Sequence, residues 1–279
     1  MHQGIVGLGM WCVDTTYKLQ KLPNRGQLEI VNDSFKCVGG GPSNVLTDLE
    51  SLGFKYPKVA MGSIGRDSVA EYIKAHCKKN RIQTNYLIPS LKTPTSHTVC
   101  MYEQQKERTF LYYPGANDLI DIKHNKIGSL NFTPKILYIG YLTLLGKLDS
   151  FHKGQTRLTK VLKFANKKQI LTVIDLASSS DPGFKKIVMS AIPYTNYLLM
   201  NEIEAKLAAV NLPCASTVNV GICVAEPYEP AVTAVLSKLT VTVLPEPAVD
   251  NPVPPATVSV SESRSIDKAP PESPWKSKS

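Results

Sequence analysis

The chain has 279 residues and a mass of 30.6 kDa, which is enough for one large α/β domain or two smaller ones. Apolar residues make up 43% and charged residues 20%, so the composition excludes wholesale disorder, collagen and long coiled coils. No stretch approaches the ~18 consecutive apolar residues of a membrane span, and we expect no membrane partner. The apolar start of the chain has no basic residue before it, which argues against a secretory signal.

The net charge of +9 is unevenly spread. Residues 1–210 hold 27 Lys and Arg against 16 Asp and Glu, whereas residues 211–279 hold five against seven. The positive net charge of residues 1–210 suits an anionic ligand such as a nucleotide phosphate. The simpler alternative is a surface of solvated lysines. The basic residues form no single stripe along the sequence, and no RNP, zinc-finger or helix-turn-helix signature is present. We therefore expect no nucleic-acid partner.

The six cysteines are widely scattered, with no Cys-x-x-Cys pair and no histidine partner close by. This pattern is typical of reduced thiols and favours neither a zinc site nor a disulfide framework. We therefore expect a cytoplasmic protein.

Up to about residue 210, short apolar runs alternate with segments of helical periodicity. The runs are rich in Val, Ile, Leu or Tyr and lack polar residues at alternate positions, as expected for strands buried on both faces. The segment Pro42–Leu52 places its branched apolar residues on one helical stripe, and the segment Ser150–Lys168 does the same. This alternation predicts a mainly parallel sheet with helices on both faces. The predicted strands are Gly4–Gly9, Lys58–Gly62, Ile136–Gly140, Ile170–Asp175 and Asn196–Met200.

Two segments interrupt this alternation. Thr15–Cys37 and Ser96–Tyr113 are rich in Thr, Tyr, Phe and Val, and we predict antiparallel hairpins that form a small second sheet. Pro114–Asn117 is predicted as the turn that closes the second hairpin.

The composition changes at residue 211. Eleven of the 20 prolines lie beyond this point, but only one of the 17 glycines. We leave residues 211–244 without an assigned fold, apart from a predicted strand at Ser237–Leu244. The Pro- and Ser-rich residues 245–279 are predicted to be a disordered tail.

Open parallel sheets bind ligands beyond the carboxyl ends of their strands, so polar residues at those ends are the first site candidates. Asp14 follows the first predicted strand, and Asp175 ends the fourth. The loop Gly39–Asn44 leads directly into a helix, where glycines allow a ligand to approach the backbone and the helix start offers free N–H groups. Asn201 and Glu204 follow the last predicted strand.

Each candidate also has a purely structural interpretation. Asp14 and Asp175 suit helix or turn caps, and a run of glycines is often only a turn. Asn201 and Glu204 have the spacing of a capping box, in which two residues three positions apart bond each other's backbone. The five histidines show no ligand spacing, so we predict no direct protein ligand for a metal.

Several of these motifs follow one another in a fixed order, which makes them more specific than any single motif. They are Gly9–Asp14, Val38–Asn44, Leu52-Gly53, Gly62–Asp67, Arg108–Asn117, Asp175–Ala177 and Asn201–Glu204, the last an Asn-x-x-Glu. The series resembles the ribokinase/pfkB family of carbohydrate kinases over roughly residues 4–210. The resemblance implies a ribokinase-like three-layer α/β/α sandwich over residues 1–210, with a small β-sheet lid from about residues 15–37 and 96–113.

The resemblance also implies a reaction and a set of site residues. The reaction would be transfer of the γ-phosphoryl group of ATP to a hydroxyl of a sugar or nucleoside, with Mg²⁺. Asp14, Asn44 and the backbone of Gly39 and Gly40 would bind the substrate hydroxyls, because a polyol needs both acceptors and donors. The lid would cover the substrate and mediate a homodimer.

The family's Asn-x-x-Glu motif implies a second role. Asn201 and Glu204 would organise Mg²⁺ and its waters near the phosphates.

The chain departs from the family in its C-terminal part. The family's Asp-Thr-x-Gly-Ala-Gly-Asp supplies the general base and an anion hole for the phosphoryl group, and no glycine follows Gly221 here. The family's Thr-x-Gly nucleotide motif is missing as well. We therefore identify no catalytic residue, and we expect compromised nucleotide binding and a kinase of impaired activity. The alternative is a non-catalytic sugar-binding pseudokinase or regulatory module.

Overall fold

The computed structural model describes residues 2–103, 108–208, 219–222 and 237–239. The predicted tail at residues 245–279 and most of residues 211–244 lie outside these ranges. No helix within the described ranges is long and apolar enough to cross a membrane.

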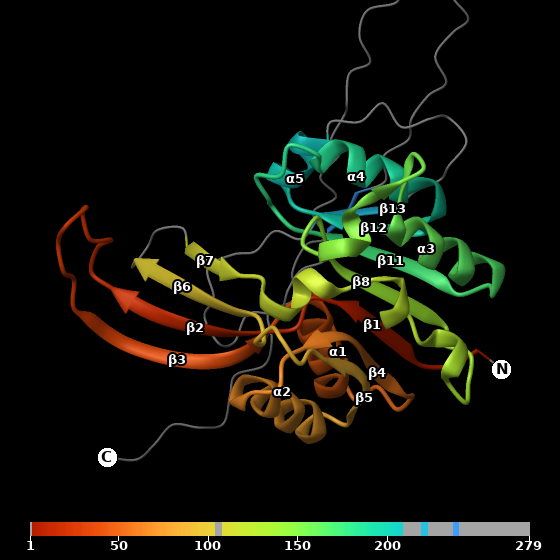
Figure 1. Cartoon of the computed structure of the whole chain (residues 1–279), viewed down its shortest axis with the longest axis horizontal. Coiled ribbons are helices and arrows are strands. Elements are labelled where there is room, and N and C mark those ends of the chain that lie inside the picture. The colour runs from red at the N-terminus through yellow and green to blue at the C-terminus, as the bar shows by residue number, and fades with distance from the viewer. Residues whose placement is uncertain (1, 104–107, 209–218, 223–236, 240–279) are drawn as a thin grey trace, which may run out of the picture. The chain divides into compact units, whose positions relative to one another are not determined.

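The main sheet has eight strands in the order β14-β13-β12-β11-β8-β1-β4-β5, and all neighbours are parallel except β13 and β14 (Figure 1). Its strands are β1 (Ile5–Gly9), β4 (Lys58–Ile64), β5 (Ile82–Pro89), β8 (Ile136–Leu142), β11 (Leu171–Leu176), β12 (Tyr197–Met200), β13 (Asn219–Ile222) and β14 (Ser237–Leu239). The predicted parallel sheet is confirmed, and all five predicted strands appear with small shifts of their ends. The sheet also continues beyond residue 210, through β13 and β14.

Helices cover both faces of this sheet, which gives the predicted three layers. Alternate residues of one strand enter different cores. Val6 and Leu8 of β1 pack on the side of α3 and α4, while Ile5 packs on the side of α1 and α2. The helices are α1 (Gly41–Ser51), α2 (Ser68–Lys79), α3 (Arg157–Lys167), α4 (Phe184–Ala191) and α5 (Glu202–Ala208), with short 3-10 helices η1 (Gly115–Leu119), η2 (Ile122–His124), η3 (Ile127–Ser129), η4 (Gly146–Asp149) and η5 (Ile192–Tyr194).

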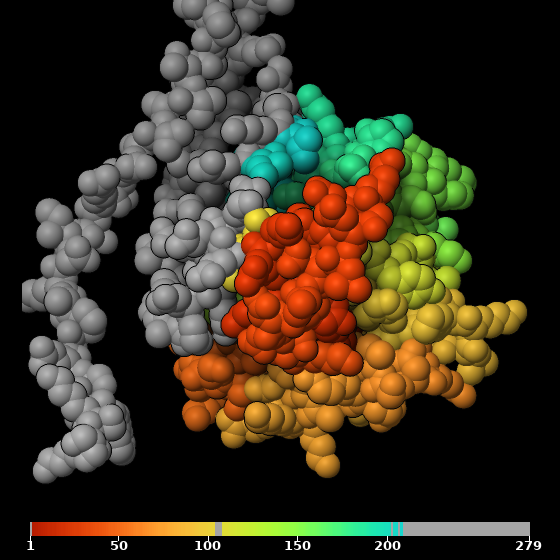
Figure 2. Space-filling view, turned by 90° about the vertical axis from the view of Figure 1, so that its left-hand side faces the viewer, coloured from red at the N-terminus to blue at the C-terminus, as the bar shows by residue number. Residues whose placement is uncertain are grey.

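A separate four-stranded sheet has the order β3-β2-β6-β7 and projects from the end of the main sheet (Figure 1). Its strands are β2 (Cys12–Leu19), β3 (Val31–Gly39), β6 (His97–Glu103) and β7 (Thr109–Tyr113). The two predicted hairpins are confirmed, and a parallel pairing of β2 with β6 joins them into one sheet. In Figure 2 the N-terminal strands, in red, lie foremost on the face toward which this sheet projects.

Two local predictions need correction. The helix predicted from Ser150 begins only at Arg157, because a small hairpin of β9 (Phe151–His152) and β10 (Gln155–Thr156) precedes it. The hairpin turns at Lys153 and Gly154, both with positive φ, so the helix cannot start earlier. The predicted turn at Pro114–Asn117 is the start of the 3-10 helix η1.

Candidate functional site

The first candidate, Asp14, is positioned by the connection between the two sheets. Only two residues separate β1 from β2, so the chain passes directly from the carboxyl end of the central strand into the lid. Asn117 fixes this crossing: its side chain accepts from Trp11 N at 3.3 Å and donates to Trp11 O at 3.4 Å. The Trp11 indole donates in turn to Met61 O at 3.0 Å. Asp14 therefore lies on β2 of the lid, just beyond the carboxyl end of the central strand β1.

The glycine loop lies beside Asp14 because β3 pairs with β2. Gly39 is so close to Asp14 that a β-carbon at this position would collide with the carboxylate. Gly40 has a φ of +94°, and a β-carbon there would collide with the carbonyl oxygen of Met10. These two positions therefore require glycine, and the loop lies directly against the Asp14 carboxylate.

The helix that follows the loop starts without a side-chain cap. Gly40 is its N-cap, and Pro42 lies in its first turn. The buried hydroxyl of Ser43 has no hydrogen-bond partner. Asn44 is exposed on the same turn. The N-terminal end of α1 thus presents backbone N–H donors without a side-chain cap next to Asp14.

Beneath the loop, two tyrosines connect Asp14 with the next strand of the main sheet. Tyr141 is half-buried, and its partial removal from solvent, with the nearby charges of Asp175 and Asp14, raises its pKa. Tyr138 donates to Asp175 at 2.6 Å. Burial raises the pKa of Asp175 to about 7, and the nearby Glu204 adds to the effect, while the Tyr138 bond opposes it.

Asn201 and Glu204 form the capping box that the sequence offered as the structural alternative. Glu204 N donates to Asn201 Oδ1 at 2.8 Å, and Asn201 N donates to Glu204 Oε2 at 2.9 Å. The other Glu204 oxygen accepts from Ser178 Oγ at 3.0 Å and from Asn201 Nδ2 at 2.9 Å. Both carboxylate oxygens are therefore occupied by protein donors, and the pair is held rigidly at the carboxyl end of β12.

These groups form one row along the carboxyl ends of neighbouring strands. The charges of Asp14 and Asp175 both act on Tyr141, and the charge of Glu204 acts on Asp175. Tyr141, Asp175 and Glu204 belong to or follow β8, β11 and β12, which are neighbours in the main sheet, and Asp14 lies on β2 just beyond the end of β1. The predicted substrate-binding residues and the predicted magnesium-organising residues therefore lie at the same end of the main sheet, the carboxyl ends of its strands. The described residues contain no group of three or more His, Cys, Asp or Glu side chains arranged to hold a metal ion.

Three members of this region were not predicted from the sequence. Tyr141 lies near the end of β8 and Ser178 lies just beyond β11, which was the only signal in the sequence, while Tyr138 lies inside β8. A further buried carboxyl, Asp149, accepts from Leu145 N at 2.7 Å through one oxygen, while its other oxygen has no partner. Burial raises the pKa of Asp149 to about 7, and the charge of Asp181 adds to the effect.

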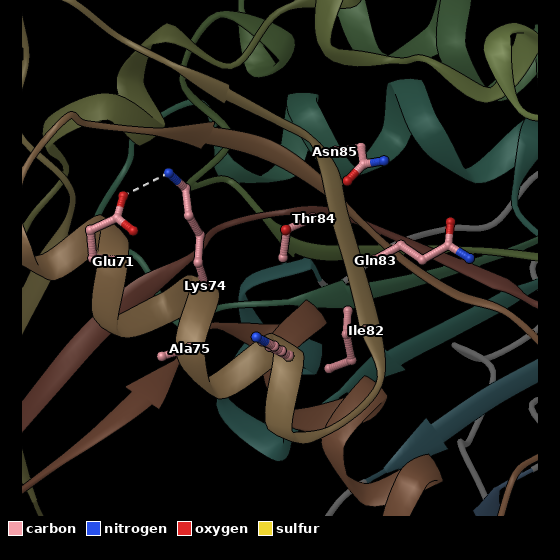
Figure 3. Close-up of a pocket in the computed structure, with 8 residues that line it drawn as sticks. Glu71, Lys74, Ala75, Ile82, Gln83, Thr84 and Asn85 are labelled. Carbon is pink, nitrogen blue, oxygen red and sulfur yellow. Dashed lines mark hydrogen bonds and ion pairs between the residues drawn. The ribbon is translucent and has the colours of Figure 1, made fainter.

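A separate hollow of about 440 Å³ lies between α2 and the edge strand β5 (Figure 3). It is lined by polar residues of the strand, such as Gln83 and Asn85, and by Glu71 and Lys74 of the helix, which pair at 2.8 Å. None of the predicted site residues borders it. We therefore place the candidate site in the row at the carboxyl ends of the strands.

Comparison with solved structures defines the class of this fold. The chain is similar to the ribokinase from Giardia lamblia, with 18% identity and a TM-score of 0.63 over 80% of this chain and 69% of that one. It is also similar to the Arabidopsis thaliana ribokinase solved with ribose and ATP, with 18% identity, a TM-score of 0.56 and coverage of 75% and 64%. A nucleoside kinase from Methanocaldococcus jannaschii matches with 16% identity, a TM-score of 0.54 and coverage of 80% and 71%. The fold is therefore a ribokinase-like α/β sandwich with a β-sheet lid.

The family is established by a second comparison. A model of the pfkB family of carbohydrate kinases matches residues 5–222, which is most of the chain. The chain belongs to this family. It spans less than two thirds of the length of the Arabidopsis ribokinase.

Proposed function

We propose that the row from Asp14 to Glu204 binds a sugar or nucleoside at one end and the phosphates of ATP at the other. The observation that supports this most is the fit of Gly39 against the Asp14 carboxylate, beside a helix start with unused donors. Asp14 would accept from substrate hydroxyls, and Asn44 and the loop N–H groups would donate. This is the donor and acceptor mixture that a polyol needs.

At the other end of the row, Asn201 and Glu204 would orient waters around Mg²⁺. Both oxygens of Glu204 already accept hydrogen bonds, so direct coordination would require these bonds to break. Magnesium keeps several waters in most protein sites, and a fixed carboxylate can hold them from a distance. Mg²⁺ would bridge and neutralise the phosphates of ATP.

We also propose that the 279 residues do not complete phosphoryl transfer by themselves. Transfer to a hydroxyl needs a positioned base and donors that stabilise the moving phosphoryl group. No Gly-Ala-Gly-Asp follows Asn201, and the chain has no glycine after Gly221. This absence also favours the second candidate function, a non-catalytic sugar-binding module.

The lid would cover the bound substrate, and its exposed apolar side chains support a homodimer formed through this sheet. Leu28 is 86% exposed and Ile30 is 70% exposed in the connection between β2 and β3, and Phe110 and Leu111 are exposed on β7 at the opposite edge of the sheet. A second copy of the chain would cover these apolar side chains.

The binding proposal is tested by calorimetry against a panel of sugars and nucleosides. Asp14→Asn should weaken the best ligand by about 30- to 1000-fold, which corresponds to ~2–4 kcal/mol for hydrogen bonds to a charged acceptor. Asp33→Asn is the matched control, because Asp33 lies on the same sheet and pairs only with the exposed Lys18. Equal affinities of the two variants would contradict the assignment.

Catalysis is tested by comparing the turnover of this chain with that of a chimaera. An ATP-dependent phosphorylation assay of the ligand found above should give background turnover for the 279 residues. A chimaera that carries a family-type C-terminal part after Val210 should be faster by at least ~10². Robust turnover without that part would place the general base among the present residues and remove the impaired-kinase proposal.

A further inference from the structure

The charge of this chain is concentrated in one stretch of the fold. Residues 121–191 contain twelve Lys and Arg against four Asp, a net of +8, compared with +9 for the whole chain. Two of the four aspartates, Asp149 and Asp175, are largely withdrawn from solvent and have a pKa raised to about 7. A third, Asp121, binds the only arginine of the stretch, Arg157, through two hydrogen bonds of 2.7 and 2.8 Å. The lysines therefore dominate the surface potential of this part.

The fold gathers many of these lysines on one side of the main sheet, although they form no stripe in the sequence. The inner stripe of α3 is buried in the core, and Lys160, Lys163 and Lys167 lie on its exposed side. The helices α3 and α4 pack against each other, and both contact the β9–β10 hairpin (Figure 1). We call this surface the lysine face; its members are Lys147, Lys153, Lys160, Lys163, Lys167, Lys168 and Lys186.

Contacts between side chains connect the lysines of α3 and α4 through the β9–β10 hairpin. Lys186 of α4 lies 4.6 Å from the centre of the Phe151 ring in the hairpin. Lys163 of α3 donates to Gln155 of the same hairpin at 3.0 Å. Phe151 is 37% exposed, so an apolar ring lies at the surface among the ammonium groups.

We propose that the lysine face binds the surface of a bilayer that contains anionic lipids. Lysines near an anionic membrane each contribute about 1 kcal/mol, which is about five-fold in affinity. An exposed aromatic ring among them can enter the headgroup region. Peripheral binding of this kind needs no spanning helix. It departs from the expectation of no membrane partner, which rested on the lack of a long apolar stretch.

The composition of the face favours a bilayer over a nucleic acid or an acidic protein. Bidentate recognition of bases and phosphates favours guanidinium groups, and the one arginine of this stretch is held by Asp121. Lysine is depleted at protein interfaces, whereas diffuse attraction to anionic headgroups needs only point charges. The proposal is independent of the kinase assignment, since no member of the face belongs to the row of site residues.

Co-sedimentation of the full chain with vesicles tests the proposal. Binding to phosphatidylcholine vesicles that contain phosphatidylserine should exceed binding to pure phosphatidylcholine vesicles at ~0.15 M salt, and it should be lost near ~1 M salt. The double variant Lys160→Gln/Lys167→Gln should bind about 25-fold more weakly, from five-fold for each lysine. Phe151→Ser should weaken the binding that remains at intermediate salt.

The matched control is the double variant Lys78→Gln/Lys79→Gln on α2, which removes the same charge from the other side of the sheet. It should leave vesicle binding within about two-fold of the unmodified chain, against 25-fold for the α3 pair. Equal losses in the two double variants would show that net charge is responsible and overturn the assignment to this face. A chain that binds both kinds of vesicle alike, or that binds a single-stranded RNA oligonucleotide through Lys160 and Lys167 but not the anionic vesicles, would also overturn it.

Discussion

The close approach of the glycine loop to the lid can be tested with two alanine substitutions that differ mainly in the available space. Gly40 and Gly26 both have positive φ, of 94° and 81°. A β-carbon at Gly40 would collide with the Met10 carbonyl oxygen, whereas one at Gly26 would meet nothing within 4 Å. Both variants carry the strain of positive φ, which is at least as large at Gly40, because its ψ of 141° lies outside the left-handed helical region. The steric collision is present only in Gly40→Ala.

The expected magnitudes follow from these two terms. An alanine forced to positive φ costs ~1–2 kcal/mol, and this should be the whole effect of Gly26→Ala. Gly40→Ala adds the displacement of packed backbone, for which overpacking costs of ~1–3 kcal/mol apply. We expect losses in the free energy of unfolding of about 1–2 kcal/mol for Gly26→Ala and about 2–5 kcal/mol for Gly40→Ala.

Urea denaturation of both variants and calorimetry with the best sugar or nucleoside would measure the two consequences. Gly40→Ala should also lose ligand affinity, because the loop must move away from Asp14, while Gly26→Ala should bind as the unmodified chain does. If the two variants lose the same stability and both keep the ligand, then the loop is not packed as described and the placement of the site would be wrong.

Three further substitutions test buried polar groups, each by urea denaturation. Asp149 has a pKa of about 7 in the folded chain against 3.8 as a free side chain, so its contribution to stability is largest at low pH and is lost as the pH rises through 7. Between pH 8 and pH 5 the free energy of unfolding should rise by about 2–3 kcal/mol from this group, and Asp149→Asn should remove that part of the slope; parallel pH profiles would contradict the burial of the carboxyl. Asn117→Leu should cost about 2–4 kcal/mol, because it leaves the buried Trp11 backbone without partners, and a neutral effect would mean that the lid connection is held elsewhere. Asp67→Ala should cost about 1–3 kcal/mol, since it removes the N-cap of α2 and two bonds to Thr95, and a loss below ~0.5 kcal/mol would show that these bonds are not formed.

The sequence by itself determined the layered architecture. Short runs without polar alternation predicted strands buried on both faces, and the stripe in Pro42–Leu52 predicted α1, because burial imposes a residue pattern that local spacing reveals. The lid hairpins were equally visible from their Thr, Tyr and Phe content. The elements α2, α4 and β5 were not named from the sequence, since charged residues interrupt the apolar residues of α2 and α4, and uncharged polar residues interrupt those of β5.

Only the tertiary structure decided which residues meet. Asp14 and Glu204 are far apart in the chain. The strand order β1-β8-β11-β12 brings Tyr141 within reach of the charges of Asp14 and Asp175, and Asp175 within reach of the charge of Glu204. The roles of Tyr138 and Ser178 were not predicted, because Tyr138 lies inside an apolar strand, a serine just beyond a strand is common, and the partner of each lies on another element. The lysine face likewise depends on the packing of α3 against α4. Contacts and surface potential arise from residues distant in sequence, and these distances are fixed only when the sheet forms.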